Sequence, residues 1–314
     1  MVIAVAVIAA LVIVLRQCGR RPSPAETAPV AEAPPATPTV GERCSEGGYA
    51  EAARANRESL ETLPWAPFGR LEHGWAIYAP LVGRELGTEC GPGSERFAAL
   101  LAGWRAAHRL PETGVFDEAT FRLMKQEWHR RRPFVRTRMA GVCPEPPQDG
   151  ELATARPEEG YGGKTIQLRP EALAAYRRMV EAAHDELPYL RDDPRWLTIF
   201  SGYRSPVSDA ARCARENNCQ GIVRAACSPH RTGYAIDLYL GYAPGFPPDS
   251  SADPNRLFMS RTAAYRWLVA HADAYGFVNY PFEPWHWEWR GGPQVPGSNA
   301  RRSSARPPSA PPVA

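Results

Sequence analysis

Two short stretches of this 314-residue sequence carry side chains that together suit a metal site. The first, Ser228–Leu238, reads S-P-H-R-T-G-Y-A-I-D-L and contains His230 and Asp237. The second, much later in the chain, reads E-P-W-H and ends at His286. Two imidazoles and one carboxylate are ligands that zinc uses when a fourth position stays open for water. These residues therefore predict one Zn²⁺ ion held by His230, Asp237 and His286.

Two further side chains suit hydrolysis beside such an ion. Zinc lowers the pKa of a bound water from about 15.7 toward about 7. Glu283, at the start of the second stretch, is placed to take the proton of that water and pass it to a leaving amine. Arg204 follows an apolar segment in S-G-Y-R-S and could stabilise the oxyanion that forms on a cleaved carbonyl. From spacing alone, a surface arginine is the simpler interpretation of Arg204.

The prediction rests on the combination of motifs, because single histidines are usually structural or solvated. We expect that role for His271, which lies in a helical stretch, and for His108 and His129, which lie among charged helical residues.

The elements around these residues are expected to bring them together. Thr232-Gly233 suggests a turn that presents His230 at a strand edge, and Ala235–Leu240 is an apolar run rich in β-formers that would carry Asp237. Trp285–Trp289 alternates aromatic and polar residues, as a half-buried strand does. A further strand is predicted at Leu197–Phe200, and helices at Ser94–Ala107, from Asp117 as a cap, and over Pro170–Leu187, Asp209–Glu216 and Arg261–Tyr275.

Three motifs, in the same order along the chain, resemble the VanY-like D-alanyl-D-alanine carboxypeptidases, zinc peptidases grouped with VanX-type dipeptidases. They are Ser201–Ser205, the S-x-H-x-x-G-x-A-x-D pattern from Ser228, and Glu283–His286, within roughly Thr165–Arg290. The resemblance implies His230, Asp237 and His286 as zinc ligands, Glu283 as catalytic base and Arg204 as stabiliser of the tetrahedral intermediate. It also implies an α+β fold with a small antiparallel sheet and flanking helices.

The resemblance further implies that Ser228 lines the substrate site, and we group Tyr203, Asp209 and Trp285 with it as candidate substrate contacts. Many relatives carry Gln at the position of Asp209, so the change bears on substrate preference rather than on the metal. Cys227 lies three residues before His230. We expect it in a disulfide or as a buried thiol, because a fourth protein ligand would close the position needed for water.

A smaller, mostly helical region is expected at residues 43–142. Its helix pair, joined by T-G-V-F-D-E-A-T at Thr113–Thr120, resembles the helical peptidoglycan-binding module attached to many wall hydrolases. The usual Phe-Gln ending is replaced by Glu127-Trp128. The alternative is a helical hairpin that only packs on the larger domain.

The remaining segments complete a six-part organisation. Residues 1–21 contain the apolar run Val2–Leu15 followed by arginines, which predicts an export signal or membrane anchor. The sequence leaves open on which side of the membrane the following chain lies. Residues 22–42 are a Pro/Ala-rich linker, 143–164 a connector, 165–292 the catalytic domain and 293–314 a disordered tail. We expect a periplasmic or other extracytoplasmic protein that meets the membrane only through its first segment.

Composition limits which classes of partner and which kinds of cysteine site are expected. A net charge of +3 gives no strong attraction for nucleic acid. Of the seven cysteines none forms a Cys-x-x-Cys pair, which disfavours a structural zinc site, and disulfides are plausible in an oxidising compartment. Cys213 and Cys219 are the nearest candidate pair, connectivity is open, and Cys18 is left over. The oligomeric state is not indicated.

The function expected is removal of the C-terminal D-amino acid from peptidoglycan stem peptides. An endopeptidase could use the same zinc site on a bond within the stem peptide or cross-bridge. A non-catalytic wall-binding or signalling module with a vestigial zinc site is the alternative outside enzymes.

Overall fold

The computed structural model describes residues 43–148, 150–217, 219 and 226–291. The predicted apolar segment, linker and C-terminal tail (1–21, 22–42 and 293–314) lie outside these residues, as does Cys18. Within the described part of the chain, no helix combines the length and the hydrophobicity that crossing a membrane requires.

The first described region is mostly helical, as expected. The predicted cap at Asp117 is confirmed, because Asp117 accepts a hydrogen bond from the Thr120 amide at 2.8 Å, and Ser94 caps the preceding helix in the same way through the Phe97 amide at 3.3 Å. These caps fix where two of the helices begin. The elements are α3 (Ala50–Thr62), β1 (Pro64–Trp65), β2 (Glu72–His73), α4 (Ala79–Glu85), α5 (Glu95–Ala107), α6 (Glu118–Arg131) and α7 (Pro133–Met139).

Aromatic side chains form the centre of this helical region. The rings of Trp75 and Phe116 stack with centroids 4.1 Å apart, and Phe121 meets Trp65 edge to face at 4.9 Å. This cluster continues without a break into the core around the large sheet, where Trp287 is 2% exposed. The two regions therefore share one hydrophobic core.

The segment predicted as a connector contains local structure of its own. The strand β3 (Ala153–Thr154) pairs antiparallel with β4 (Gln167–Leu168), and two short 3₁₀ turns lie between them, η1 (Pro157–Glu159) and η2 (Tyr161–Gly163). The connector is thereby tied to the first strand of the following region.

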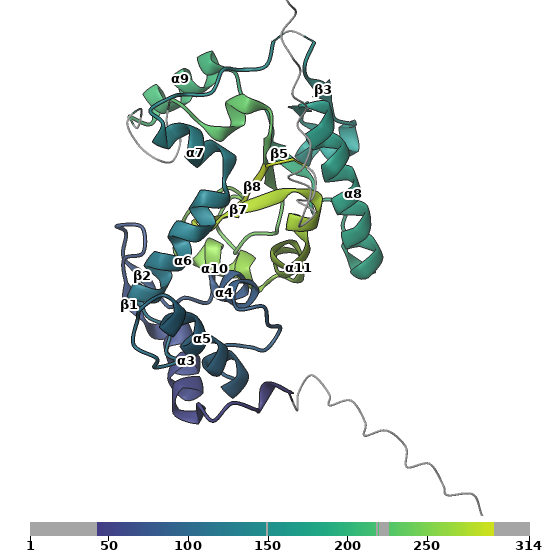
Figure 1. Ribbon diagram of the computed structural model, residues 1–314. Coiled ribbons are helices and arrows are strands. Elements are labelled where there is room, and N and C mark those ends of the chain that lie inside the picture. Colours follow the sequence, from purple (N-terminus) through teal and green to yellow (C-terminus); the bar gives the residue numbers. More distant parts are fainter. Residues whose placement is uncertain (1–42, 149, 218, 220–225, 292–314) are drawn as a thin grey trace, which may run out of the picture. The chain divides into compact units, whose positions relative to one another are not determined.

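A four-stranded antiparallel sheet, in the order β5-β6-β8-β7, carries two of the predicted ligands, Asp237 and His286. Figure 1 shows β5, β7 and β8 of this sheet. The expected α+β class with a small antiparallel sheet is confirmed. The strands are β5 (Ile199–Ser201), β6 (Ala235–Leu238), β7 (Phe277–Tyr280) and β8 (Glu283–Trp289).

The helices of this region agree with most predicted ones, with one correction. The helix expected over Arg261–Tyr275 is interrupted, because Thr262 is extended and caps a new helix through the Tyr265 amide at 3.2 Å. The chain then tightens into a 3₁₀ turn that ends at Gly276 with φ of 86°. The elements are α8 (Pro170–Glu186), η3 (Pro188–Arg191), α9 (Pro206–Arg215), η4 (Pro229–Thr232), α10 (Asp253–Arg261), α11 (Ala263–His271) and η5 (Ala272–Tyr275).

Buried ion pairs join the helical region to the sheet region. Glu72 pairs with Arg256 of α10, whose guanidinium also donates to Tyr78 Oη at 2.6 Å. Arg132, between α6 and α7, pairs with Glu288 of β8 at 2.5 Å. In Figure 1, α6 runs from the helical region to the sheet, where it contacts β7.

Three disulfides cross-link the described residues: Cys44–Cys90, Cys143–Cys227 and Cys213–Cys219. Cys213 and Cys219, the nearest candidate pair in a connectivity that the sequence left open, are bonded, and Cys227 is in a disulfide as expected. Cys143–Cys227 ties the connector to the segment that carries His230.

Candidate metal centre and active site

Strand pairing brings two of the predicted ligands face to face. Asp237 on β6 lies directly opposite His286 on β8, and Ser201 on β5 lies opposite Asp237 on its other side. All four residues of β6 are buried, so its side chains are held firmly on both faces.

His230 reaches the same point from the turn before β6. It belongs to η4, which ends at Gly233 with φ of 73°, a left-handed conformation that favours glycine. A Cβ at this glycine would also approach Leu152 Cδ2 to 3.1 Å and Arg169 Cγ to 3.2 Å. The T-G pair after His230 therefore acts as the turn that the sequence predicted.

The three side chains converge in a buried group. Asp237 Oδ1 lies 2.7 Å from His286 Nδ1, and Asp237 Oδ2 lies 3.1 Å from His230 Nε2. The ligand atoms of all three residues are within 4.8 Å of one another. One carboxylate thus bridges two imidazoles in an arrangement that could bind a metal ion.

The outer nitrogens of both imidazoles face fixed partners. His230 Nδ1 lies 2.8 Å from the carbonyl of Gly202, which holds the proton on that nitrogen and leaves Nε2 as the ligand atom. His286 Nε2 lies 3.4 Å from Glu288 Oε1, within ion-pair distance but without hydrogen-bond geometry, and Nδ1 faces Asp237. This pattern of outer partners is typical of metal-ligating histidines.

The three side chains of this group shift one another's pKa values. Burial lowers the pKa of His230, although Asp237 acts in the opposite direction. Burial would raise the pKa of Asp237, but the two imidazoles outweigh it and lower that pKa far below the usual range. Burial would lower the pKa of His286, but Asp237 and Glu288 raise it to about 9. Two buried carboxylates around one imidazole make this position attractive to a cation.

Glu283 begins β8 and lines the same cleft as the three ligands. Burial raises its pKa, Asp237 acts in the same direction, and His286, Arg132 and Arg212 partly offset both. Among the described residues, no ion pair fixes its carboxylate. The side chain of Asn279 donates to the carbonyls of Glu283 at 3.3 Å and of His286 at 2.9 Å, and so shapes the backbone that presents both.

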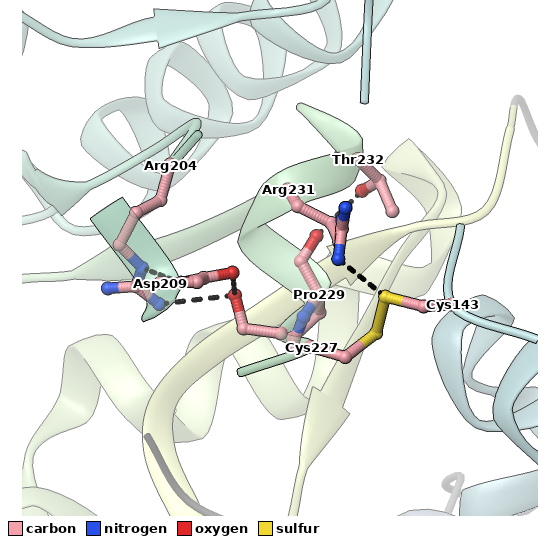
Figure 2. The surroundings of a disulfide bond; sticks show 8 residues. Cys143, Arg204, Asp209, Cys227, Pro229, Arg231 and Thr232 are labelled. Carbon is pink, nitrogen blue, oxygen red and sulfur yellow. Dashed lines mark hydrogen bonds and ion pairs between the residues drawn. A yellow bond between two sulfur atoms is a disulfide. The ribbon is translucent and has the colours of Figure 1, made fainter. Parts of the chain in front are cut away.

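Arg204 lies at the cleft with its guanidinium tied to a buried carboxylate. Arg204 Nε donates to Asp209 Oδ1 at 2.5 Å, and Ser228 Oγ donates to Asp209 Oδ2 at 2.6 Å. The Asp209 side chain is fully buried, whereas that of Arg204 is 17% exposed. Figure 2 shows Arg204 and Asp209 on one side of Pro229 and the Cys143–Cys227 disulfide on the other.

The other predicted substrate contacts differ in their access to the cleft. Ser228 and Trp285 line it, whereas Asp209 lies behind Arg204. The backbone amide of Tyr203 donates to the Gln167 carbonyl at 2.7 Å, and its side chain is not among those lining the cleft.

The cleft has a volume of about 620 Å³ and receives one wall from outside the sheet region. That wall is α7, and four of its side chains face the cleft beside the buried Arg132 that precedes it. Cationic side chains outnumber acidic ones along its lining. Besides the residues already named, the lining includes Phe134, Val135, Arg138, Met139, Lys164, Phe200, Asp249, Ser251 and Tyr280.

Sequence reasoning did not identify Glu288, Arg132 or Asn279. Glu288 could have been found, because it lies two residues after His286 in an alternating strand and so shares its face. Arg132 gives no such signal, since its partner is 156 residues away.

Comparison with known proteins agrees with this geometry. Residues 165–292 match the family model of VanY, D-alanyl-D-alanine carboxypeptidase. A search of curated proteins found no match. The resemblance of the helical region to a peptidoglycan-binding module stays a prediction. The matched segment contains the sheet, His230, Asp237, His286 and Glu283, and residues 165–292 are therefore a VanY D-alanyl-D-alanine carboxypeptidase domain.

Proposed function

We propose that this protein is a zinc-dependent carboxypeptidase that removes the C-terminal D-amino acid from peptidoglycan stem peptides. The observation that carries the proposal is the convergence of His230, Asp237 and His286 at one end of a cleft that Glu283 also lines.

The donor set suits zinc. Two imidazole nitrogens and one carboxylate oxygen are ligands of catalytic zinc sites, and the outer partners of both imidazoles leave the right nitrogen facing Asp237. When bound, zinc would polarise the scissile carbonyl and make hydroxide available near neutral pH.

The protein's own residues would perform the proton and charge chemistry. The Glu283 carboxylate takes the proton of the attacking water and donates it to the leaving amine. Burial raises the pKa of Glu283, which favours the first step, because a more basic carboxylate accepts the proton of water more readily. Arg204, oriented by Asp209, offers its guanidinium to the developing oxyanion.

The charge of the cleft suits an anionic peptide. Arg138, Lys164, Arg204 and Arg212 all line it, and a stem peptide ending in a free carboxylate would be attracted to this surface. Arg212, which also pairs with Glu216 at 3.8 Å, lines the same cleft as Glu283 and so places a cation in the cleft that holds the candidate base. That is where the terminal carboxylate of a carboxypeptidase substrate must lie.

The same proposal includes an extracytoplasmic location. Three disulfides persist best in an oxidising compartment, and peptidoglycan lies outside the cytoplasm. The apolar segment at residues 1–21 would serve for export or as an anchor.

The test uses the purified protein with defined tetra- and pentapeptide muropeptides, with and without a chelator, and reads the products by mass. We expect chelator-sensitive loss of one terminal residue, restored by Zn²⁺ and absent in Glu283→Gln. Cleavage within the peptide would replace the carboxypeptidase by an endopeptidase. Bound zinc without cleavage of any substrate would favour a binding module.

A further inference from the structure

A buried arginine from outside the VanY domain reaches toward the metal centre. Arg132 precedes α7, and its side chain is only 7% exposed. Its Nε and Nη2 donate to Glu288 Oε1 at 2.9 and 2.5 Å. The guanidinium also lies over the Tyr280 ring, 4.1 Å from its centroid. Arg132 is therefore held on two sides in a single orientation.

Glu288 is the residue through which Arg132 meets the ligands. Its other oxygen, Oε2, accepts a hydrogen bond from the Phe134 amide at 3.1 Å, and the side chain is 3% exposed. The oxygen bound by Arg132 is also the one that lies 3.4 Å from His286 Nε2. The Glu288 carboxylate thus contacts the first turn of α7, Arg132 and the outer nitrogen of His286.

This arrangement is poorly explained as a source of stability alone. Removing a guanidinium and a carboxylate from water costs several kcal/mol per ion, so buried pairs often add little net stability. A carboxylate behind a metal-ligating histidine, by contrast, fixes the orientation of the ring and strengthens it as a ligand. Glu288 lies behind His286 in this way, and hydrogen bonds from Arg132 and from the Phe134 amide keep its carboxylate there.

We propose that Arg132 is a positioning residue of the metal site, acting through Glu288 to orient His286 for metal binding. The helical region thereby completes a site whose ligands all belong to the VanY domain. The proposal rests on the metal dependence stated under the proposed function, but it does not require that the bound metal be catalytic.

The structure offers a matched control. Glu72 and Arg256 form a second buried ion pair between the same two regions, and their side chains are 4% and 1% exposed. Arg256 is also held at an aromatic ring, 4.1 Å from the centroid of Phe282. The control pair lines neither the cleft nor the ligand group. Its loss should therefore disturb packing between the regions without disturbing the metal.

The experiment compares Glu288→Gln, Arg132→Met, Arg132→Lys and the control Glu72→Gln in the full chain. Zinc affinity is measured by competition with a chromogenic chelator, ligand geometry by the visible spectrum of the Co²⁺-loaded protein, and folding by circular dichroism and Tm. We expect Glu288→Gln and Arg132→Met to weaken zinc binding by about 10- to 100-fold and to change the Co²⁺ spectrum. Arg132→Lys should recover part of the affinity, since it restores the charge without the two-pronged contact.

Glu72→Gln should lower Tm and leave zinc affinity and the Co²⁺ spectrum unchanged. The proposal is overturned if Glu288→Gln and Arg132→Met, folded by circular dichroism, bind zinc and Co²⁺ as the unmodified protein does. A protein that binds zinc but cleaves nothing would reject the proposed function and leave this comparison valid. A protein that binds neither metal would overturn both proposals together.

Discussion

Asp237 and His286 are 49 residues apart in the chain, yet they are direct partners across the β6–β8 pair, with Oδ1 and Nδ1 2.7 Å apart. The pairing depends on register, because a slip of one residue would turn one of the two side chains to the opposite face of the sheet. Both strands are buried along nearly their whole length, which specifies the register strongly. These two candidate metal ligands are thus placed by the same contacts that hold the sheet together.

Replacing Glu283 by Gln should abolish turnover without loss of metal. We expect kcat to fall by about 100- to 10,000-fold, because general base catalysis contributes that much and an amide cannot accept the proton. Zinc content, measured after gel filtration, should stay at the unmodified level. Asp249→Asn, an acidic residue of the same cleft, is the control and should change kcat little. Comparable kcat losses in both variants would mean that cleft charge, not a base, is needed.

Replacing Asp209 by Asn should disturb Arg204 more than the fold. The variant removes the charge that holds the guanidinium at 2.5 Å, while the amide oxygen can still accept from Ser228. If Arg204 acts on the oxyanion, we expect kcat to fall by about 100-fold with a smaller change in KM, as for loss of one oxyanion donor. Ser208→Ala, on the exposed side of α9, is the control. Unchanged kcat in Asp209→Asn would argue that Arg204 does not need its partner.

The convergence of the three predicted ligands could be anticipated from sequence because each of them is tied to a local motif. His230 has its T-G turn, Asp237 its apolar strand and His286 its aromatic alternation, and each local pattern agrees with the sheet that forms. Arg132 and Glu288 come into contact only in the folded chain, and the sequence around neither residue predicts its partner. The boundary at Thr262 was missed because the cap that begins α11 depends on local backbone geometry.

Removing the Cys143–Cys227 disulfide should affect both stability and the metal site. The bond closes a loop with a sequence separation of 84 and holds the segment from Cys227 to His230, where Arg231 also donates to Cys143 Sγ (Figure 2). The double variant Cys143→Ser/Cys227→Ser should lose about 2–5 kcal/mol of unfolding free energy. We also expect weaker zinc binding, measured by chelator competition. Cys44→Ser/Cys90→Ser is the control: it should lower stability and leave zinc affinity intact. Equal zinc affinity in both variants would show that the η4 turn holds His230 without this disulfide.

Stability in acid should depend on Glu159, which lies far from the ligands in sequence and joins η1 to α8. Burial opposes its charge, but hydrogen bonds from Arg177 and Arg156 outweigh burial and lower the pKa of Glu159 from 4.5 to about 2. Because the folded pKa is the lower one, the stabilisation is complete above pH 4.5 and is lost as the pH falls toward 2.

Glu159→Gln should therefore lower the unfolding free energy at pH 7 by about 2 kcal/mol, since the partly exposed arginines are screened by solvent. The difference from the unmodified protein should shrink as the pH falls below about 4.5 in a series of urea titrations. Glu158→Gln is the matched control, because that neighbouring side chain is 67% exposed against 6% for Glu159. A difference that stays constant down to pH 2.5 would mean that the Glu159→Gln effect comes from packing rather than charge.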